Sequence, residues 1–311
     1  MKQHYSIWKQ VSLYRRGSID TSNEIMPTHS LFSINPNDER HFEIREDAVS
    51  FNVLIHNIET GNITKFDKTI ICIVAFSEYS TVKQISEILT LMGLDFSENI
   101  LNSSIKRLHK NTLITISKIS EANAKIVSLD KNGDEIAKRL DVPHTWNAFQ
   151  RVDEAWKLKT VLCCNQIRNA YLKSKLPLKW FKVREKLTIG ELAIRPSFAT
   201  QISDTNFIFE VVRQKEDWIN VFIEKIGRYD EILNNLEGNS WDMSGDYYLV
   251  INGENFEHNL KILEIIRSLK LSIPIENILF TEDLLQFGEK FKNSLYTISK
   301  DNSPDYLQFN I

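Results

Sequence analysis

Two short helical segments separated by a tight turn are the feature that most constrains the fold of this chain. Apolar residues recur at helical spacing over residues 81–92, and the segment starts at Thr81 with the spacing of a capping box. Gly93 follows, a residue that tolerates the positive φ with which helices often end. Ser97 suits the N-cap of a second helix over 98–110. The pattern therefore predicts two consecutive helices joined by a short turn.

The second of these helices is predicted to have one apolar and one polar face. Leu101, Ile105 and Leu108 fall on one side. The other side, with Arg107 flanking it, carries amides, a hydroxyl and cations: Asn99, Asn102, Ser103, Lys106 and Lys110. Such residue types reach phosphates and base edges in duplex DNA. The alternative interpretation is a polar face that is only solvated.

A β-hairpin is predicted after the two helices. Residues 113–119 are β-branched and free of Gly and Pro, 121–124 form a turn, and 125–129 return as a second strand. The polar run 130–133 then precedes a short helix over 134–140.

Together with an apolar helix expected over 65–79, this order resembles a winged helix-turn-helix domain, here assigned to residues 65–142. The resemblance implies that the second helix of the pair reads duplex DNA, and we expect Asn99, Asn102, Ser103, Lys106 and Arg107 to contact the site. It also implies that Lys118 and Lys125 on the hairpin contact the DNA backbone. A small helical subdomain without DNA contacts is the alternative.

Charge is distributed unevenly along the chain. The net charge of −3 over 311 residues is not that of a protein that binds nucleic acid through overall charge. Basic residues outnumber acidic ones over 65–213, whereas 214–311 carry 17 acidic and 9 basic residues. A local basic region is typical of specific DNA contact, with chance segregation as the alternative. The acidic last third also predicts a docking surface for a protein partner, or a DNA mimic.

The cysteine, histidine and hydropathy patterns exclude several classes of protein. Three cysteines give neither a CxxC pair nor a disulfide framework, which predicts a reducing, cytoplasmic setting. The longest apolar run, 70–76, is too short to span a membrane, and the N-terminal residues lack the apolar segment of a signal peptide. Phosphate-binding glycine motifs and the HExxH zinc motif are absent from the sequence.

Residues 1–64 are predicted to form an N-terminal arm with one or two strands over 41–57. A single winged helix covers few base pairs and rarely reaches tight specific affinity alone. Two-fold dimers are the commonest oligomers, so we expect a homodimer that uses residues 1–60 in part.

Residues 143–311 are predicted to form an α/β domain, so that the whole chain is α+β, and Pro143 marks its start. Helices are expected over 152–175, 216–236, 256–269 and 282–291. Strands are expected over 180–183, 191–194 running on toward 202, 206–212, 247–251, 275–280 and 295–298. This alternation predicts a partly parallel sheet with helices on both faces, and the apolar run 207–212 predicts its central strand.

The segments 194–198, 207–213 and 225–229 match the layout of the restriction-endonuclease-like PD-(D/E)XK core. Together with the upstream helix pair, they resemble the replication-relaxation proteins of mobile genetic elements. That resemblance implies a sequence-specific DNA-binding protein of a mobile element or phage-like locus. Its accessory or regulatory role would lie in transcription regulation or plasmid replication.

The metal site of the PD-(D/E)XK family is incomplete in this sequence. The family holds a divalent metal with an Asp and a Glu-x-Lys motif, but Ser197 stands in place of the Asp and Val212 in place of the Lys. Glu210 is retained, and Arg213 is expected to point away from it because strand residues alternate faces. One carboxylate holds Mg²⁺ poorly. The sequence therefore favours a nuclease-like fold without a cofactor and without nuclease chemistry.

Two other interpretations of Glu210 stay open. In one, the protein is a Mg²⁺-dependent nuclease with a rearranged site, in which Glu191, Asp204 or Glu185 joins Glu210 and Lys225 takes part. In the other, Glu210 is an isolated buried acid paired with a nearby cation: Lys225, Arg228 or Arg195.

Overall fold

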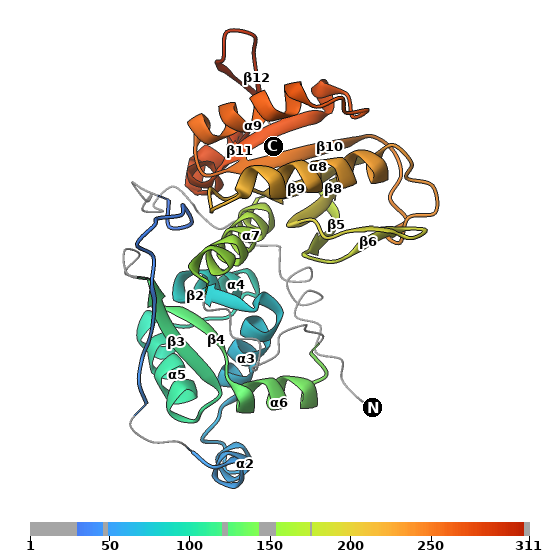
Figure 1. Cartoon of the computed structure of the whole chain (residues 1–311). Coiled ribbons are helices and arrows are strands. Elements are labelled where there is room, and N and C mark those ends of the chain that lie inside the picture. Colours follow the sequence, from blue (N-terminus) through green and yellow to red (C-terminus); the bar gives the residue numbers. More distant parts are fainter. Residues whose placement is uncertain (1–29, 46–48, 120–123, 143–153, 175, 308–311) are drawn as a thin grey trace. The chain divides into compact units, whose positions relative to one another are not determined.

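The computed structural model describes residues 30–45, 49–119, 124–142, 154–174 and 176–307 (Figure 1). These residues form two compact units, one of residues 35–165 and one of residues 30–34 and 166–307. The division lies inside helix α7 (Ala155–Lys173). It therefore comes later than the boundary predicted at Pro143, a residue outside the described ranges. The described residues 35–64 of the predicted arm belong to the first unit.

Three helices of the first unit confirm the expected segments. They are α3 (Lys65–Ser77), α4 (Val82–Leu91) and α5 (Glu98–Lys110). The capping box at the start of α4 is present in both directions, since Gln84 N donates to Thr81 Oγ1 and Thr81 N donates to Gln84 Oε1, each at 3.1 Å. Gly93 has a φ of +69°, as its place after α4 predicted.

An antiparallel sheet accompanies these helices in the strand order β1-β3-β4-β2. Its strands are β1 (Arg40–Phe42), β2 (Tyr79–Thr81), β3 (Ile114–Ile119) and β4 (Ile126–Leu129). The β3–β4 pairing confirms the predicted hairpin, whose turn at 120–123 lies outside the described residues. The strand β2 between α3 and α4 was not predicted, and it pairs with β4.

The prediction of strands over 41–57 is largely wrong. Among the residues of this stretch that the structure describes, only the three-residue β1 is a strand, and helix α2 (Phe51–Glu59) follows it. Ser50 accepts a hydrogen bond from Val53 N and begins that helix. Leu54 is fully buried, Phe51, Ile55 and Ile58 are half-buried, and Val53 is 50% exposed. The buried set thus follows helical spacing, which these apolar residues fit as well as they fit alternation.

Helix α6 (Lys131–Arg139) begins earlier than the expected 134. Asp130 is its N-cap, and the Asp130 carboxylate accepts from Lys131 N at 2.7 Å. Gly133, the last residue of the polar run expected to precede this helix, lies inside it. A Cβ at this position would lie 1.9 Å from the carbonyl oxygen of Leu113. Gly133 therefore serves close packing of α6 rather than a turn.

The second unit is built on a mixed seven-stranded sheet in the order β13-β12-β11-β10-β9-β8-β5. Strands β5 (Leu178–Val183), β8 (Phe198–Ile202) and β9 (Thr205–Val211) are antiparallel neighbours. Strands β9, β10 (Tyr247–Gly253) and β11 (Ile278–Glu282) are parallel. Strands β12 (Leu295–Ile298) and β13 (Pro304–Leu307) add an antiparallel edge. The partly parallel sheet is confirmed, and β9 is the buried interior strand that residues 207–212 predicted.

Helices cover both faces of this sheet, as predicted. Helix α8 (Trp218–Leu233) connects β9 to β10, and α9 (Phe256–Ser268) connects β10 to β11. Both pack on the face that carries Ile208 of β9. Tyr171 of α7 packs against Phe198 and Phe209 with ring centroids 5.6 and 5.2 Å away, and Phe209 points to the opposite face from Ile208.

The expected strand 191–194 is the second strand of a separate hairpin, formed by β6 (Leu187–Ile189) and β7 (Leu192–Ile194). The helix expected over 282–291 is wrong, since this stretch forms two 3₁₀ helices, η2 (Asp283–Gln286) and η3 (Gly288–Asn293). Asp283 turns inward to accept from Arg213 and Asn252, and the Gln286 amide donates to Thr281 Oγ1 at 2.7 Å. These buried hydrogen bonds hold the segment in 3₁₀ turns, although the spacing of its apolar residues predicted an α-helix.

Another 3₁₀ turn, η1 (Ile275–Asn277), replaces the start of the strand expected over 275–280. Among the helices described, none has the length and apolar character needed to cross a lipid bilayer.

Candidate functional site

The outer face of α5 presents a stripe of polar side chains to solvent. Asn99, Ser103, Lys106 and Lys110 are exposed, and their spacing of four, three and four residues places them on one side of the helix. Asn102 beside them is half-buried. Neither Lys106 nor Lys110 forms an ion pair with a residue that the structure describes.

The inner face of α5 is buried, as the apolar spacing predicted. Leu101, Ile105 and Leu108 are at most 3% exposed. Ser97 accepts a hydrogen bond from Ile100 N at 3.3 Å and begins the helix. Burial of this face against the rest of the unit leaves the polar stripe as the surface that α5 offers to a ligand.

Arg107, expected among the DNA-reading residues, is bound to an acid inside the unit instead. Its Nε donates to Asp67 Oδ2 and its Nη2 to Asp67 Oδ1, both at 2.9 Å. Asp67 is fully buried and closes the capping box of α3 with Thr64. Burial raises the pKa of the Asp67 carboxyl, but hydrogen bonds from Arg107, Thr64 and Ser104 outweigh burial and hold that pKa below its usual value. Arg107 therefore fixes α5 to the start of α3.

The predicted backbone-contacting lysines both lie on the β3–β4 hairpin. Lys118 is half-buried on β3, where it is in register with His41 of β1. Lys125 precedes β4, and its Nζ lies 3.2 Å from Glu43 Oε1. The pKa of His109 near the end of α5 is lowered by burial and by the positive charges of Arg45 and Lys125. The end of α5 and the hairpin are thus neighbours in the first unit.

In the second unit, Glu210 on β9 is buried and fully engaged. Lys225 Nζ donates to Oε1 at 2.6 Å, and Tyr229 Oη donates to Oε2 at 2.8 Å. Both donors lie on α8, one turn apart. The interpretation of Glu210 as a buried acid paired with Lys225 matches this geometry, whereas sequence reasoning missed Tyr229. Tyr229 follows Lys225 by four residues, which places both side chains on one face of a helix. This spacing is the sequence signal that could have indicated Tyr229 as a second partner of Glu210.

Ser197 at the Asp position of the motif and Arg213 next to its Lys position have structural roles. Ser197 Oγ accepts from Val211 N at 3.0 Å and so ties β8 to β9. Arg213 donates to Asp283 Oδ1 at 2.8 Å, with both side chains buried.

The carboxylates proposed for a rearranged nuclease site stand apart. Asp204 in the β8–β9 turn pairs with Lys179, Glu185 pairs with Lys182, and Glu191 is exposed in the β6–β7 turn. Asp204 and Glu210 lie six positions apart on an extended chain, which separates them by about 20 Å. Within the described ranges, no three His, Cys, Asp or Glu residues gather as a metal-binding group.

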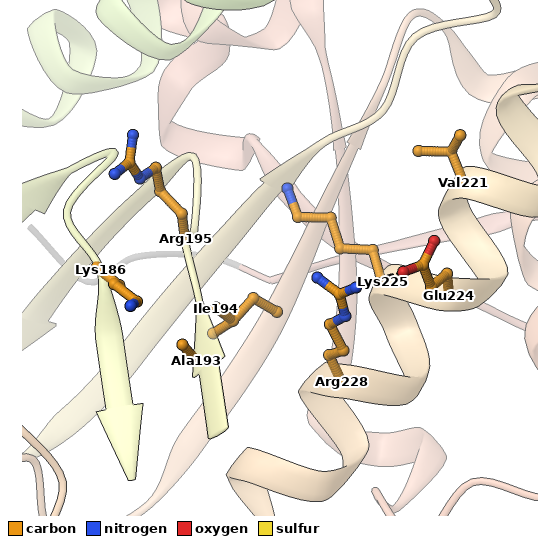
Figure 2. A pocket seen from close by; sticks show the side chains of 8 residues that line it. All are labelled: Lys186, Ala193, Ile194, Arg195, Val221, Glu224, Lys225 and Arg228. Carbon is orange, nitrogen blue, oxygen red and sulfur yellow. Dashed lines mark hydrogen bonds and ion pairs between the residues drawn. The ribbon is translucent and has the colours of Figure 1, made fainter. Parts of the chain in front are cut away.

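A basic pocket of about 420 Å³ lies between α8 and the β6–β7 hairpin (Figure 2). The hairpin side contributes Lys186, Ala193, Ile194 and Arg195, and the helix side contributes Val221, Glu224, Lys225 and Arg228. Sequence reasoning missed this pocket. The helix residues recur at the spacing of one face, but no local pattern indicates that the hairpin packs beside them.

Comparison with known proteins identifies no relative of this chain. No protein-family model, no curated protein and no solved structure matches it. The function is therefore inferred from the side chains and the geometry of the two units.

Proposed function

We propose that this chain is a sequence-specific DNA-binding protein that inserts α5 into the major groove of duplex DNA. The observation that carries the proposal is the exposed stripe of Asn99, Ser103, Lys106 and Lys110 on a helix whose other face is buried. Amide side chains are suited to bidentate contacts with adenine, and lysines to guanine and phosphates. An α-helix is also the element that the major groove admits.

The first unit supports a winged helix-turn-helix as the frame for that contact. Its order is α3, β2, α4, α5 and then the β3–β4 hairpin, with β2 paired to β4. We propose α5 as the recognition helix and the hairpin as the wing. In this proposal Lys118 contacts the DNA backbone, and Lys125 does the same after exchanging its ion pair with Glu43 for a phosphate.

The second unit supports a restriction-endonuclease-like core without cleavage chemistry. In favour of it, three antiparallel sheet strands, β5, β8 and β9, follow α7, and α8 then leads to the parallel strand β10, with the separate β6–β7 hairpin inserted between β5 and β8. A metal-dependent nuclease is the alternative on such a core. Lys225 and Tyr229 occupy both oxygens of Glu210, the acid that such a nuclease requires, so we favour binding without cleavage.

The role suggested by the resemblance, an accessory or regulatory protein of a mobile element, stays a prediction. So do a homodimer and a protein partner for the acidic last third.

The proposal is tested by selecting duplexes from a random DNA library with the full chain and then measuring affinity for the selected site. The double variant Lys106→Gln, Lys110→Gln removes two cations from the stripe. We expect it to bind at least tenfold more weakly, or about 1.4 kcal/mol. The matched control, Lys270→Gln with Lys300→Gln, removes two exposed cations from the second unit and should retain affinity. Equal affinity of both double variants would exclude α5 as the recognition helix.

A further inference from the structure

The pocket between α8 and the β6–β7 hairpin concentrates positive charge. Four cationic side chains line it, against one carboxylate, that of Glu224. Figure 2 shows Lys225 and Arg228 extending from α8 toward the hairpin, with Arg195 at the end of β7. Like charges brought together in this way repel one another, and an anion between them relieves that repulsion.

The four cations differ in how far they are already neutralised. Lys225 is bound to the buried Glu210, and Arg228 forms an ion pair with Glu224 one helical turn away. Lys186 and Arg195 are exposed and form no ion pair with any residue in the described ranges. The charge available to a ligand therefore comes first from Lys186 and Arg195.

The shape of the pocket favours a phosphate that carries an organic group. Arginine presents a planar set of donors that matches phosphate oxygens, and lysine adds a point charge. The apolar side chains of Ala193, Ile194 and Val221 line the same pocket. A volume of about 420 Å³ exceeds what a bare phosphate fills, so the apolar wall is left to contact an attached sugar or base.

We propose that this pocket binds the phosphate group of a nucleotide unit, either free or within a nucleic acid strand. Arg195 and Lys186 supply the first contacts. Arg228 leaves its ion pair with Glu224 to bind the phosphate, while Lys225 keeps its ion pair with Glu210. This site is in the second unit and does not depend on DNA recognition by α5.

The test measures binding of adenosine 5′-monophosphate and of adenosine to the full chain by calorimetry. We expect the monophosphate to bind and adenosine to bind at least tenfold more weakly. Arg195→Gln should weaken monophosphate binding about tenfold. Glu224→Gln should strengthen it severalfold, because it releases Arg228 and removes the one carboxylate of the lining. Lys270→Gln, outside the pocket, is the matched control and should change nothing.

A short single-stranded oligonucleotide then distinguishes the two sources of phosphate. It is tested as a competitor in the Lys106→Gln, Lys110→Gln background, so that the outcome does not depend on α5. If the oligonucleotide competes with the monophosphate and Arg195→Gln weakens that competition, the pocket binds a nucleic acid strand. If the oligonucleotide does not compete, the pocket binds a free nucleotide. The proposal is overturned if adenosine binds as well as the monophosphate, if neither binds at millimolar concentration, or if Arg195→Gln and Glu224→Gln leave affinity unchanged.

Discussion

Asp67 performs two structural tasks with one buried carboxylate. It accepts from Thr64 N at the start of α3 and receives two hydrogen bonds from Arg107 of α5. Since the polar stripe lies on α5, the position of that stripe depends on this contact. Arg107, which the sequence places beside the polar face of α5, thus acts by orienting that face.

Replacing Asp67 with Asn is expected to lower the free energy of unfolding of the first unit by about 2–3 kcal/mol. The change removes a charged acceptor and leaves the Arg107 guanidinium with poorer partners in a half-buried place. Urea denaturation of the full chain measures the effect. Asp204→Asn is the matched control, because its carboxylate is 92% exposed and its pairing with Lys179 is a surface contact. The two variants should differ clearly, and equal midpoints would show that the Asp67 pair contributes little.

His258 in the second unit is a buried neutral imidazole. Its Nδ1 accepts from Glu254 N at 3.2 Å, and the Trp218 ring lies 4.7 Å away, centroid to centroid. Burial, together with the positive charges of Arg213 and Lys261, lowers the pKa of His258 to about 3.

The free energy of unfolding should therefore fall as pH decreases from about 6.5 toward 3. In this pH window the histidine is protonated in the unfolded chain and neutral in the folded chain. The free energy of unfolding therefore falls by about 1.4 kcal/mol for each pH unit. Denaturation of the wild-type chain and of His258→Gln between pH 7 and pH 4 isolates this contribution. Glu254, whose pKa burial raises, is present in both chains, so the difference between the two profiles reports His258. Parallel profiles would contradict the neutral buried state.

At the scale of elements, Gly133 sets how closely α6 approaches the strand that begins after Leu113. Gly133→Ala would place a methyl group 1.9 Å from the Leu113 carbonyl oxygen, so α6 would have to move. We expect a loss of about 1–3 kcal/mol in the free energy of unfolding. Gly227→Ala in α8 is the matched control, since a Cβ there has no neighbour within 4 Å. That variant should gain up to about 1 kcal/mol from helix propensity. Stabilisation by both substitutions would refute the close approach at Gly133.

The helices and strands that sequence patterns predicted well are those with both a period and a start signal. Helices α4 and α5 have capping residues at Thr81 and Ser97 and a single apolar face. Helix α2 was mistaken for a strand because its few apolar residues fit both periods. The segment from Asp283 was mistaken for a helix because the buried partners of Asp283 lie far away in the sequence.

The candidate sites were also predictable to different degrees, depending on how far apart in the sequence their residues lie. The polar stripe of α5 follows from one helix, and the Glu210–Lys225 pair follows from a strand and the helix after it. The partner of Arg107 is 40 positions away, and the pocket needs the placement of a hairpin against α8. No local pattern carries that information.

At the scale of the whole molecule, the two proposed sites lie in different units. The polar stripe of α5 belongs to the unit of residues 35–165, and the basic pocket belongs to that of residues 166–307. Strand β1 and helix α2 are parts of the first unit, since β1 pairs with β3 and Leu54 of α2 is fully buried. Strand β1 and helix α2 are therefore needed for the first unit itself, and every variant is best studied in the full chain.

The salt dependence of duplex affinity tests the central claim most directly. Each phosphate that a lysine neutralises steepens the plot of log affinity against log salt concentration by about 0.9. If α5 docks on DNA through Lys106 and Lys110, the Lys106→Gln, Lys110→Gln variant should show a slope shallower by up to about 2. The Lys270→Gln, Lys300→Gln control should keep the wild-type slope. A wild-type slope in the α5 variant, or an equal reduction in both variants, would contradict DNA binding through this helix.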